Sequence, residues 1–239
     1  MHNVTLLGKK YNDTILDTGK VILGETNECM GLRCQNGGIY NFLALEPKDV
    51  KFTATPCGEK SAYIISDSAN SQRTSFVLNI TPSTLLDIDL YCANKVADRV
   101  HVAYLDDFED LEGLLHITSP MSVDFCTTNS RENYLDILEK CDVAFDSRER
   151  KHLYENININ SHLILHDEFG FEILKNGKCV HQESMEPLDN LHVNGAGDTF
   201  AAFFIENFFS HDIIKSSHIA MTSTTQFLIE REDRINEKI

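Results

Sequence analysis

Positive charge is scarce in this chain. Its 239 residues include 21 Lys and Arg against 37 Asp and Glu, which gives a formal net charge of −16. Nucleic acids and other polyanions are bound by clustered cations. The composition therefore argues against a nucleic-acid partner. The acidic residues are spread along the chain without a loop at calcium-binding spacing, so we read them as a solvated surface.

Long apolar runs are missing as well. No window approaches the ~20 apolar residues that a membrane-spanning helix needs, and residues 1–8 lack the basic start and apolar stretch of a signal peptide. The seven cysteines are scattered, and no second pair complements Cys29 and Cys34 at zinc-finger spacing. We interpret the cysteines as free thiols in a reducing compartment. These features predict a cytoplasmic protein with no membrane partner.

From about residue 98 the sequence alternates between strand-like and helix-like segments. Strands are predicted over 100–104, 122–126, 143–145 and 162–165, helices over 109–116, 132–140, 148–155 and 211–230, and a hairpin over 171–182. Such alternation is typical of a parallel sheet covered by helices on both faces. The first half has few helix signals: a short strand over 4–7 ends at Gly8, and a hairpin is predicted over 61–78. The chain is therefore predicted to be an α/β protein.

The most informative segment is a glycine-rich turn that opens a helix near the C-terminus. It contains Asn194, Gly195, Ala196, Gly197 and Asp198, and an apolar run follows. Small residues leave backbone amides uncovered, and the positive end of the helix points into the turn. Such a turn can hold a phosphate. A carboxylate beside it indicates phosphoryl transfer, in which Asp198 takes the proton of an acceptor hydroxyl.

This segment resembles the Gly-Ala-Gly-Asp signature of the ribokinase family, also called the phosphofructokinase-B (pfkB) family of carbohydrate kinases. The resemblance implies a three-layer α/β sandwich with a small β-sheet lid over the sugar site. It also implies that Asp198 is the general base and that the amides of Gly195, Ala196 and Gly197 form an anion hole.

The same resemblance assigns substrate-binding roles in the first half of the chain. Asp13 has the position of an aspartate that binds sugar hydroxyls, and a carboxylate can accept two of them at once. Gly37, Gly38 and Asn41 resemble a Gly-Gly-x-x-x-Asn element, whose glycines approach the sugar and whose asparagine binds a hydroxyl. Arg73 lies where a hairpin arginine reaches the substrate. Plain alternatives stay open: a turn aspartate, a simple glycine turn and a solvated arginine.

On the phosphate side, residues 145–149 lie where the family has an Asn-x-x-Glu motif that organises Mg²⁺. Glu149 matches the glutamate and Asp146 replaces the asparagine, so both are candidate metal residues. The alternative is a helix start capped by Asp146. Asn194 and Gly170 are the candidate residues on the nucleotide, and the implied cofactors are ATP and Mg²⁺.

The sequence also departs from the family pattern. Leu165 and Asp167 replace a threonine and a glycine of the phosphate loop, and the acidic pair Asp167 and Glu168 would face a triphosphate. His192 replaces an aspartate that helps to bind potassium, which puts a monovalent-cation site in doubt. The chain is also some sixty residues shorter than usual for the family, and the gap falls between Asn41 and Lys51.

We therefore predict one ribokinase-like domain over 1–239, with lid strands from about 15–36 and 61–78. The predicted function is ATP-dependent phosphorylation of a hydroxyl on a sugar or sugar-like small molecule. The alternative is a ribokinase-fold protein that binds a metabolite or nucleotide and catalyses poorly or not at all. A homodimer through the lid is an expectation from the resemblance. The sequence names neither the substrate nor the oligomeric state.

Overall fold

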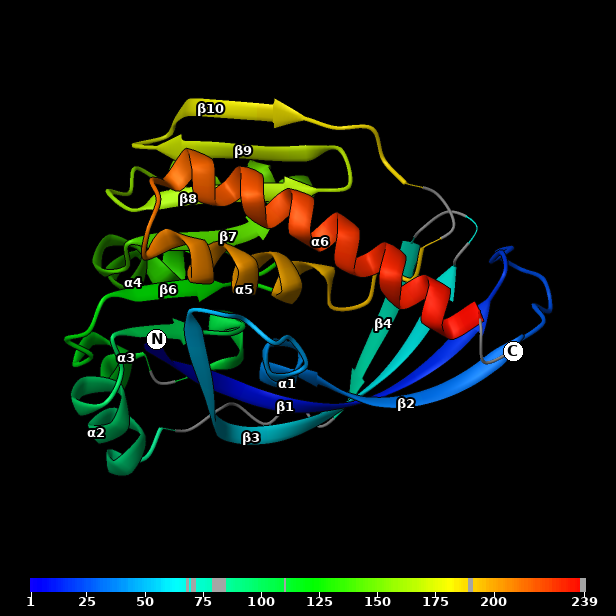
Figure 1. Ribbon diagram of the computed structural model, residues 1–239, viewed down its shortest axis with the longest axis horizontal. Coiled ribbons are helices and arrows are strands. Elements are labelled where there is room, and N and C mark those ends of the chain that lie inside the picture. The colour runs from blue at the N-terminus through cyan, green and yellow to red at the C-terminus, as the bar shows by residue number, and fades with distance from the viewer. Residues whose placement is uncertain (68, 70–71, 79–84, 110, 189–190, 237–239) are drawn as a thin grey trace.

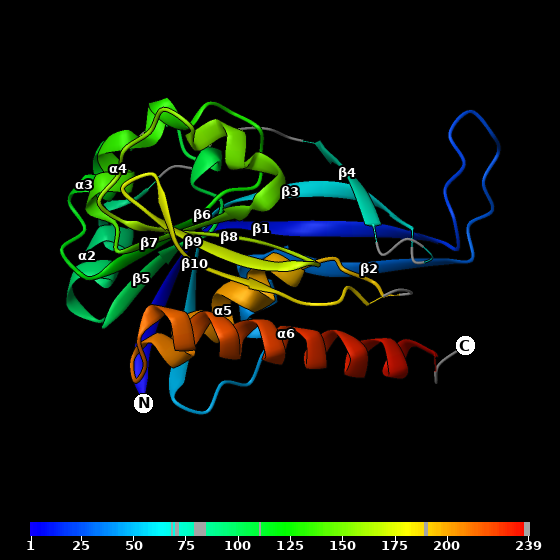
Figure 2. The ribbon, with the colours of Figure 1, turned by 90° about the horizontal axis from the view of Figure 1, so that it is seen from above.

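The computed structural model describes residues 1–67, 69, 72–78, 85–109, 111–188 and 191–236. One mixed sheet of ten strands runs through the molecule in the order β10-β9-β8-β7-β6-β5-β1-β3-β4, and β2 pairs with β1. Helices cover both faces of its central part (Figure 1). Seen from above, α5 and α6 lie on one face, and α2, α3 and α4 lie on the other (Figure 2). The predicted α/β sandwich is confirmed.

The central strands are parallel, as the alternation predicts. They are β5 (Arg99–Val102), β6 (Met121–Asp124), β7 (Val143–Ser147) and β8 (His162–Asp167), followed by the antiparallel strands β9 (Gly170–Lys175) and β10 (Lys178–Ser184). All residues of β5 and β6 are buried. Strands that are buried on both faces belong in the middle of a helix-covered parallel sheet.

Two long strands, β1 (His2–Thr18) and β3 (Val50–Asp67), are parallel partners over their whole length. They run out of the helix-covered part of the sheet, where β2 (Gly31–Gly38) flanks β1 and β4 (Gln72–Leu78) flanks β3. We call this four-stranded extension the projecting sheet (Figure 1). Residues 19–30 form no strand.

The first strand does not end at Gly8, contrary to the sequence-based prediction. A bulge between Gly8 and Lys10 shifts its register against β3, and the strand then continues. A side chain at Gly8 would lie 2.7 Å from the carbonyl oxygen of Ala103. The glycine therefore permits a close approach of two strands, which a sequence pattern alone does not distinguish from a strand end.

The helices are short except at the C-terminus. They are α1 (Ile39–Leu43), α2 (Asp87–Lys95), α3 (Glu112–Leu115), α4 (Leu135–Lys140), α5 (Ala196–Phe208) and α6 (Ile213–Asn236), with 3₁₀ segments η2 (Leu105–Asp107), η3 (Arg131–Tyr134) and η4 (Arg148–Tyr154). The helix predicted over 148–155 is thus a 3₁₀ segment. The helix predicted over 211–230 begins at Ile213 and continues to Asn236 as α6. The connection between β2 and β3 is reduced to α1 and a loop.

The hydrophobic core lies in two layers on either side of the sheet. One layer packs residues such as Val102, Val123 and Leu138 under α2, α3 and α4. The other packs Phe145 and Phe204 under α5 and α6. This second layer fixes α5 against the sheet, so the turn that precedes α5 has a defined place. None of the described helices is long and apolar enough to cross a membrane.

Candidate active site

The glycine turn leads directly into α5, with Gly195 at the N-cap. Gly195 has a φ of 78°, and a side chain there would lie 3.1 Å from the Asn41 amide nitrogen. The amide of Ala196 donates to the Val193 carbonyl oxygen at 3.0 Å. Ala196 is therefore not an open donor, which corrects its place in the predicted anion hole. Among the described residues, the amides of Gly195, Gly197 and Asp198 have no partner, as expected at a helix start.

Asp198 lies in the first turn of α5 and is buried. Its Oδ2 accepts a hydrogen bond from the Asn41 side chain at 2.6 Å, and the Tyr104 hydroxyl lies 2.9 Å from both carboxylate oxygens. Burial raises the pKa of Asp198 to about 6, against the opposing effect of the Asn41 and Tyr104 hydrogen bonds. A carboxylate with such a pKa can accept a proton near neutral pH.

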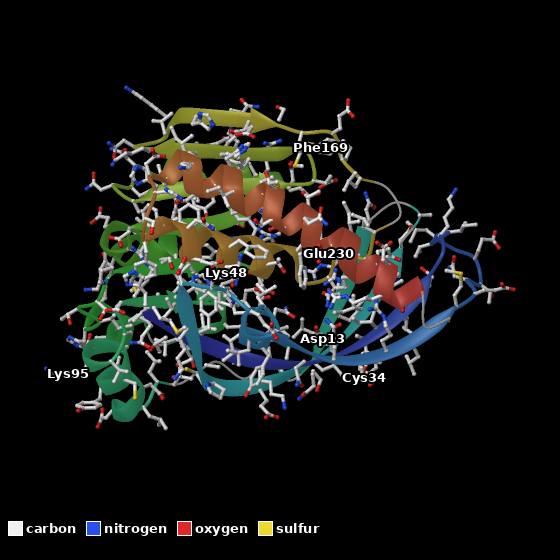
Figure 3. All side chains as sticks on the ribbon, in the orientation of Figure 1. Asp13, Cys34, Lys48, Lys95, Phe169 and Glu230 are labelled. Atoms are coloured by element: carbon white, nitrogen blue, oxygen red, sulfur yellow. The ribbon has the colours of Figure 1, made fainter. Side chains whose placement is uncertain are left out.

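Three polar residues from separate segments meet beside Asp198. The side-chain amide of Asn194 donates to Asp13 Oδ2 at 3.3 Å, and Arg73 Nη1 donates to Asn194 Oδ1 at 2.9 Å. Burial raises the pKa of Asp13. Figure 3 shows Asp13 where β1 leaves the helix-covered part of the sheet. Asn194, which was predicted to contact the nucleotide, therefore lies beside the predicted sugar-binding residues.

The two glycines of β2 also lie beside this group. A side chain at Gly37 would collide with the Asp13 carboxylate. Gly38 has a φ of 62°, and a side chain there would collide with the Lys9 carbonyl oxygen. Both positions therefore need glycine. Gly37 contacts a predicted sugar-binding residue, whereas Gly38 serves the turn into α1, which carries Asn41.

A cleft of about 650 Å³ starts at this group. Arg73, Tyr104 and Asp198 line it. Apolar side chains from the segment after β10 and from α6 line it as well: Met185, Leu188, Leu191, Val193, Met221 and Leu228. Thr224 also lines the cleft, and its buried hydroxyl has no partner among the described residues. The cleft thus has both polar and apolar lining residues and includes the turn that begins α5.

The two predicted metal residues have different surroundings. Glu149 is exposed, lines the cleft and follows Ser147, whose hydroxyl accepts its amide hydrogen bond at 3.3 Å. Asp146 is fully buried. Its carboxylate accepts hydrogen bonds from two arginines, a tyrosine and a backbone amide: Arg131, Arg150, Tyr154 and Ser147.

Both oxygens of Asp146 are therefore occupied, and its proposed role as a metal residue is wrong. Its carboxylate holds together the loops after β6 and β7. The helix-cap alternative for Asp146 is also corrected, since Ser147 is the cap of η4. Among the described residues no group of three or more His, Cys, Asp or Glu is arranged to hold a metal ion. Glu149 alone fits an ion that binds chiefly to phosphates and water.

The acidic loop after β8 is partly neutralised. Asp167 lies 3.2 Å from the Arg148 guanidinium, so this carboxylate has a cationic partner. Gly170 has a φ of 127°, and a side chain there would collide with the Glu183 carbonyl oxygen. Gly170 therefore allows β9 to approach β10, and it is not among the residues that line the cleft.

Sequence reasoning missed three residues of the cleft. His166 is the second-last residue of β8 and stacks on Phe200 with ring centroids 4.5 Å apart, and burial lowers its pKa to about 4. Asp124 ends β6, and burial raises its pKa well above the ordinary value. Tyr104 follows β5. All three lie at or just after the carboxyl ends of parallel strands, where ligands bind in open α/β sheets. That position is the sequence signal from which they could have been predicted.

The segment before the glycine turn is held by α6. Arg231 donates to the carbonyl oxygens of His192 and Asn194, the latter at 2.8 Å. The His192 ring lies between Glu232 Oε2 at 2.7 Å and Asp17 Oδ1 at 3.1 Å. Burial lowers the pKa of Arg231 to about 10, so its guanidinium is charged at neutral pH. The positively charged Arg231 guanidinium thus binds two backbone carbonyl oxygens in the segment that precedes the candidate anion hole.

Comparison with known proteins identifies the fold. No protein-family profile and no curated sequence matches this chain. Two ribokinases and a nucleoside kinase are among the solved structures that share its architecture. The first, ribokinase from Thermotoga maritima, is 10% identical and covers 94% of this chain and 92% of its own, with a TM-score of 0.62. A nucleoside kinase from Methanocaldococcus jannaschii is 15% identical, with 98% and 99% coverage and a TM-score of 0.60.

The third, ribokinase from Arabidopsis thaliana, was solved with ribose and ATP. It is 13% identical, with 93% and 91% coverage and a TM-score of 0.64. The chain therefore has a ribokinase-like fold, as the sequence resemblance predicts.

Proposed function

We propose that this protein is a kinase that transfers a phosphoryl group from ATP to a hydroxyl of a sugar or sugar-like small molecule. The observation that carries the proposal is the buried Asp198 carboxylate beside the open amides of α5, in a cleft that both of them line. A base and an anion site next to one another are what phosphoryl transfer to an alcohol needs.

The polar residues beside Asp198 would hold the acceptor. Asp13, Asn41, Asn194 and Arg73 offer carboxylate, amide and guanidinium groups, which suits several hydroxyls at once. Asp198 would take the proton of the hydroxyl that reacts. The amides of Gly195, Gly197 and Asp198 would stabilise charge on the transferring phosphoryl group.

The apolar residues of the cleft would hold the nucleobase, with the Thr224 hydroxyl free to bond to a ring atom. Arg150 and His166 also line the cleft. Mg²⁺ would arrive with the phosphates and neutralise their charge, and Glu149 is the residue that would hold it through water. Correct placement and charge neutralisation account for most of the catalysis in such reactions.

The test is consumption of ATP with Mg²⁺ across a panel of sugars, sugar phosphates, amino sugars and nucleosides. Turnover that depends on one class of acceptor supports the kinase and names that class. A panel without turnover contradicts it. A rise of the melting temperature with ATP would then favour a second candidate, a binding protein without catalysis. One observation favours that candidate: Asn41 and Tyr104 already satisfy the Asp198 carboxylate.

The pH dependence of turnover follows from Asp198. Since burial raises its pKa to about 6, the carboxylate is protonated below that pH and cannot act as a base. We expect kcat to fall about tenfold for each pH unit below about 6 and to level off above it. A pH-rate profile from 4.5 to 8 measures this. A profile that is flat across pH 6 would contradict the assignment of the base.

Arg231 gives a prediction about monovalent cations. Its guanidinium already binds the carbonyl oxygens of His192 and Asn194, so exchange of K⁺ for Na⁺ at constant ionic strength should leave turnover unchanged. We expect Arg231→Gln to lower kcat by about tenfold or more, because a shift of about 1 Å in a catalytic group can cost up to about 100-fold.

Arg234→Gln is the matched control, since Arg234 is exposed on the same helix and donates to Glu230 within it. Stimulation of the wild type by K⁺, or equal effects of the two substitutions, would refute the role of Arg231.

We further propose that the whole chain acts as one domain and that the projecting sheet is its lid. Arg73 and Ser75 of β4 line the cleft. The opposite face exposes Leu32, Tyr63, Phe76 and Leu78. Apolar surface of this kind is typical of a contact with another chain, and a second copy of this protein is the expected partner. The molecular mass in solution tests this expectation.

A further inference from the structure

The backbone of Tyr104 has an unusual conformation. Its φ of 62° and ψ of 70° are left-handed, and among the described residues only one other non-glycine residue, Asn176, has a positive φ. Asn176 lies in the tight turn between β9 and β10, where asparagine tolerates this conformation. A bulky aromatic residue is disfavoured there. Such backbone strain is found chiefly where a site requires a particular side-chain direction.

In Tyr104 this conformation directs the phenol at the candidate base. The hydroxyl lies 2.9 Å from each oxygen of Asp198. The ring packs edge-on against Tyr11, with centroids 5.5 Å apart and an interplanar angle of 85°. Tyr104 also lines the cleft. A hydroxyl within about 2.6–3.2 Å of the general base has the geometry expected of the reacting acceptor.

We propose that the Tyr104 hydroxyl occupies the place of the acceptor hydroxyl on Asp198, and that every acceptor must displace it. The proposal rests on the proposed function. Tyr104 is then a residue that determines specificity. It keeps water away from the base when no acceptor is bound, and water at that position would be the nucleophile in wasteful hydrolysis of the donor.

The same contact selects the class of acceptor. Displacement of the phenol removes a hydrogen bond to a charged group, which corresponds to about tenfold or more in binding. A simple alcohol offers Asp198 one replacement bond and nothing else. A polyol also reaches Asp13, Asn194 and Arg73, which lie in one hydrogen-bonded chain beside the base. The site therefore favours polyhydroxylated acceptors over water and monohydric alcohols.

The test compares Tyr104→Phe with Tyr11→Phe. The first removes the hydroxyl on Asp198 and keeps the ring. The second removes the hydroxyl of the neighbouring ring, which donates to Asp107 at 2.7 Å. We expect Tyr104→Phe to hydrolyse ATP without acceptor about tenfold faster than the wild type, and to lower the acceptor KM by a similar factor. Tyr11→Phe should change neither quantity.

The outcomes separate this proposal from the proposed function. Unchanged hydrolysis and KM in Tyr104→Phe, with acceptor turnover intact, would overturn the proposal alone. A fall in kcat and in hydrolysis would also overturn it, because the phenol would then assist the reaction. Phosphate found on Tyr104 of the wild type after incubation with ATP would show that the phenol is itself an acceptor. No transfer or hydrolysis in any variant would refute the kinase, and the displacement step with it.

Discussion

Asp198→Asn is expected to lower kcat by about 10²–10⁴-fold, the usual contribution of a general base. Asparagine keeps the size of the side chain and its contacts with Asn41 and Tyr104, but it cannot accept a proton at neutral pH. The acceptor KM should change little, because the acceptor exchanges one hydrogen bond to residue 198 for the bond that Tyr104 makes there, and the substitution affects both bonds alike. The measurement is the initial rate with the best acceptor of the panel at pH 7.5, for both proteins at saturating ATP.

The stability of the same variant serves as its control. Because the folded pKa of Asp198 is about 6 against an ordinary value of 3.8, the folded wild type holds a proton that the unfolded chain releases between these values. The free energy of unfolding therefore falls by about 3 kcal/mol as the pH rises from about 4 to about 6. Asp198→Asn has no carboxylate at this position, so its free energy of unfolding should not fall by this amount between about pH 4 and about pH 6. At pH 7.5 it should unfold at a urea concentration equal to or higher than that of the wild type.

A variant that unfolds earlier than the wild type would make its inactivity uninformative. A folded variant with wild-type turnover would refute Asp198 as the base. The remaining outcome is a variant that is inactive but stable. It would show that activity is lost with the base and not through unfolding of the protein. It also tests the physical reason for the raised pKa, since burial of the charge is what destabilises the wild type above pH 6.

Sequence patterns predicted the central strands and the glycine turn because these features are local. Residues 122–126 and 143–145 are apolar and lie between helix-like segments, and the structure has β6 and β7 there. The bulge at Gly8 was missed because a glycine after an apolar run fits the end of a strand as well as a bulge within it. Helix α2 was missed because its hydrophobic and polar residues show little helical periodicity.

Residues of the candidate site could be predicted from the sequence where a motif indicates which side chain faces the site. Asp13, Asn41 and Arg73 are separated by tens of residues, and the structure brings their side chains to Asn194 and Asp198. Whether they bind a sugar stays a prediction. The contact of Tyr104 with Asp198 had no sequence signal, because it depends on a left-handed backbone that tyrosine disfavours.

Asp146 shows what a motif match cannot predict. A position at the end of a strand predicts proximity to the cleft but not the occupancy of the carboxylate. Two arginines from other segments, Arg131 and Arg150, reach it from 15 residues before and 4 residues after along the chain. A motif match at one residue cannot show partners that tertiary packing supplies. The same holds for Arg231, which reaches His192 from the C-terminal helix.

Asp146→Asn is expected to lower the free energy of unfolding by about 3–5 kcal/mol, the usual effect of removing one partner of a buried ion pair. Arg131 and Asp146 have no exposed surface, and Arg131 Nη2 lies 2.8 Å from Asp146 Oδ2. Asparagine would leave the buried Arg131 guanidinium with Asp106, 3.9 Å away, as its remaining carboxylate partner. Urea unfolding at pH 7, with EDTA and again with Mg²⁺, measures the loss.

Glu59→Gln is the matched control, because it neutralises one carboxylate of an exposed pair. Glu59 lies 3.9 Å from Lys10, and about two-thirds of its side chain is exposed. Its loss should cost less than about 1 kcal/mol. If Asp146 held a metal ion instead, Asp146→Asn would lose stability only relative to the Mg²⁺-containing sample, and its unfolding in EDTA would match the wild type. Equal losses of unfolding free energy in EDTA and in Mg²⁺ would support a structural role, in which Asp146 positions Arg150 and the loop that carries Glu149.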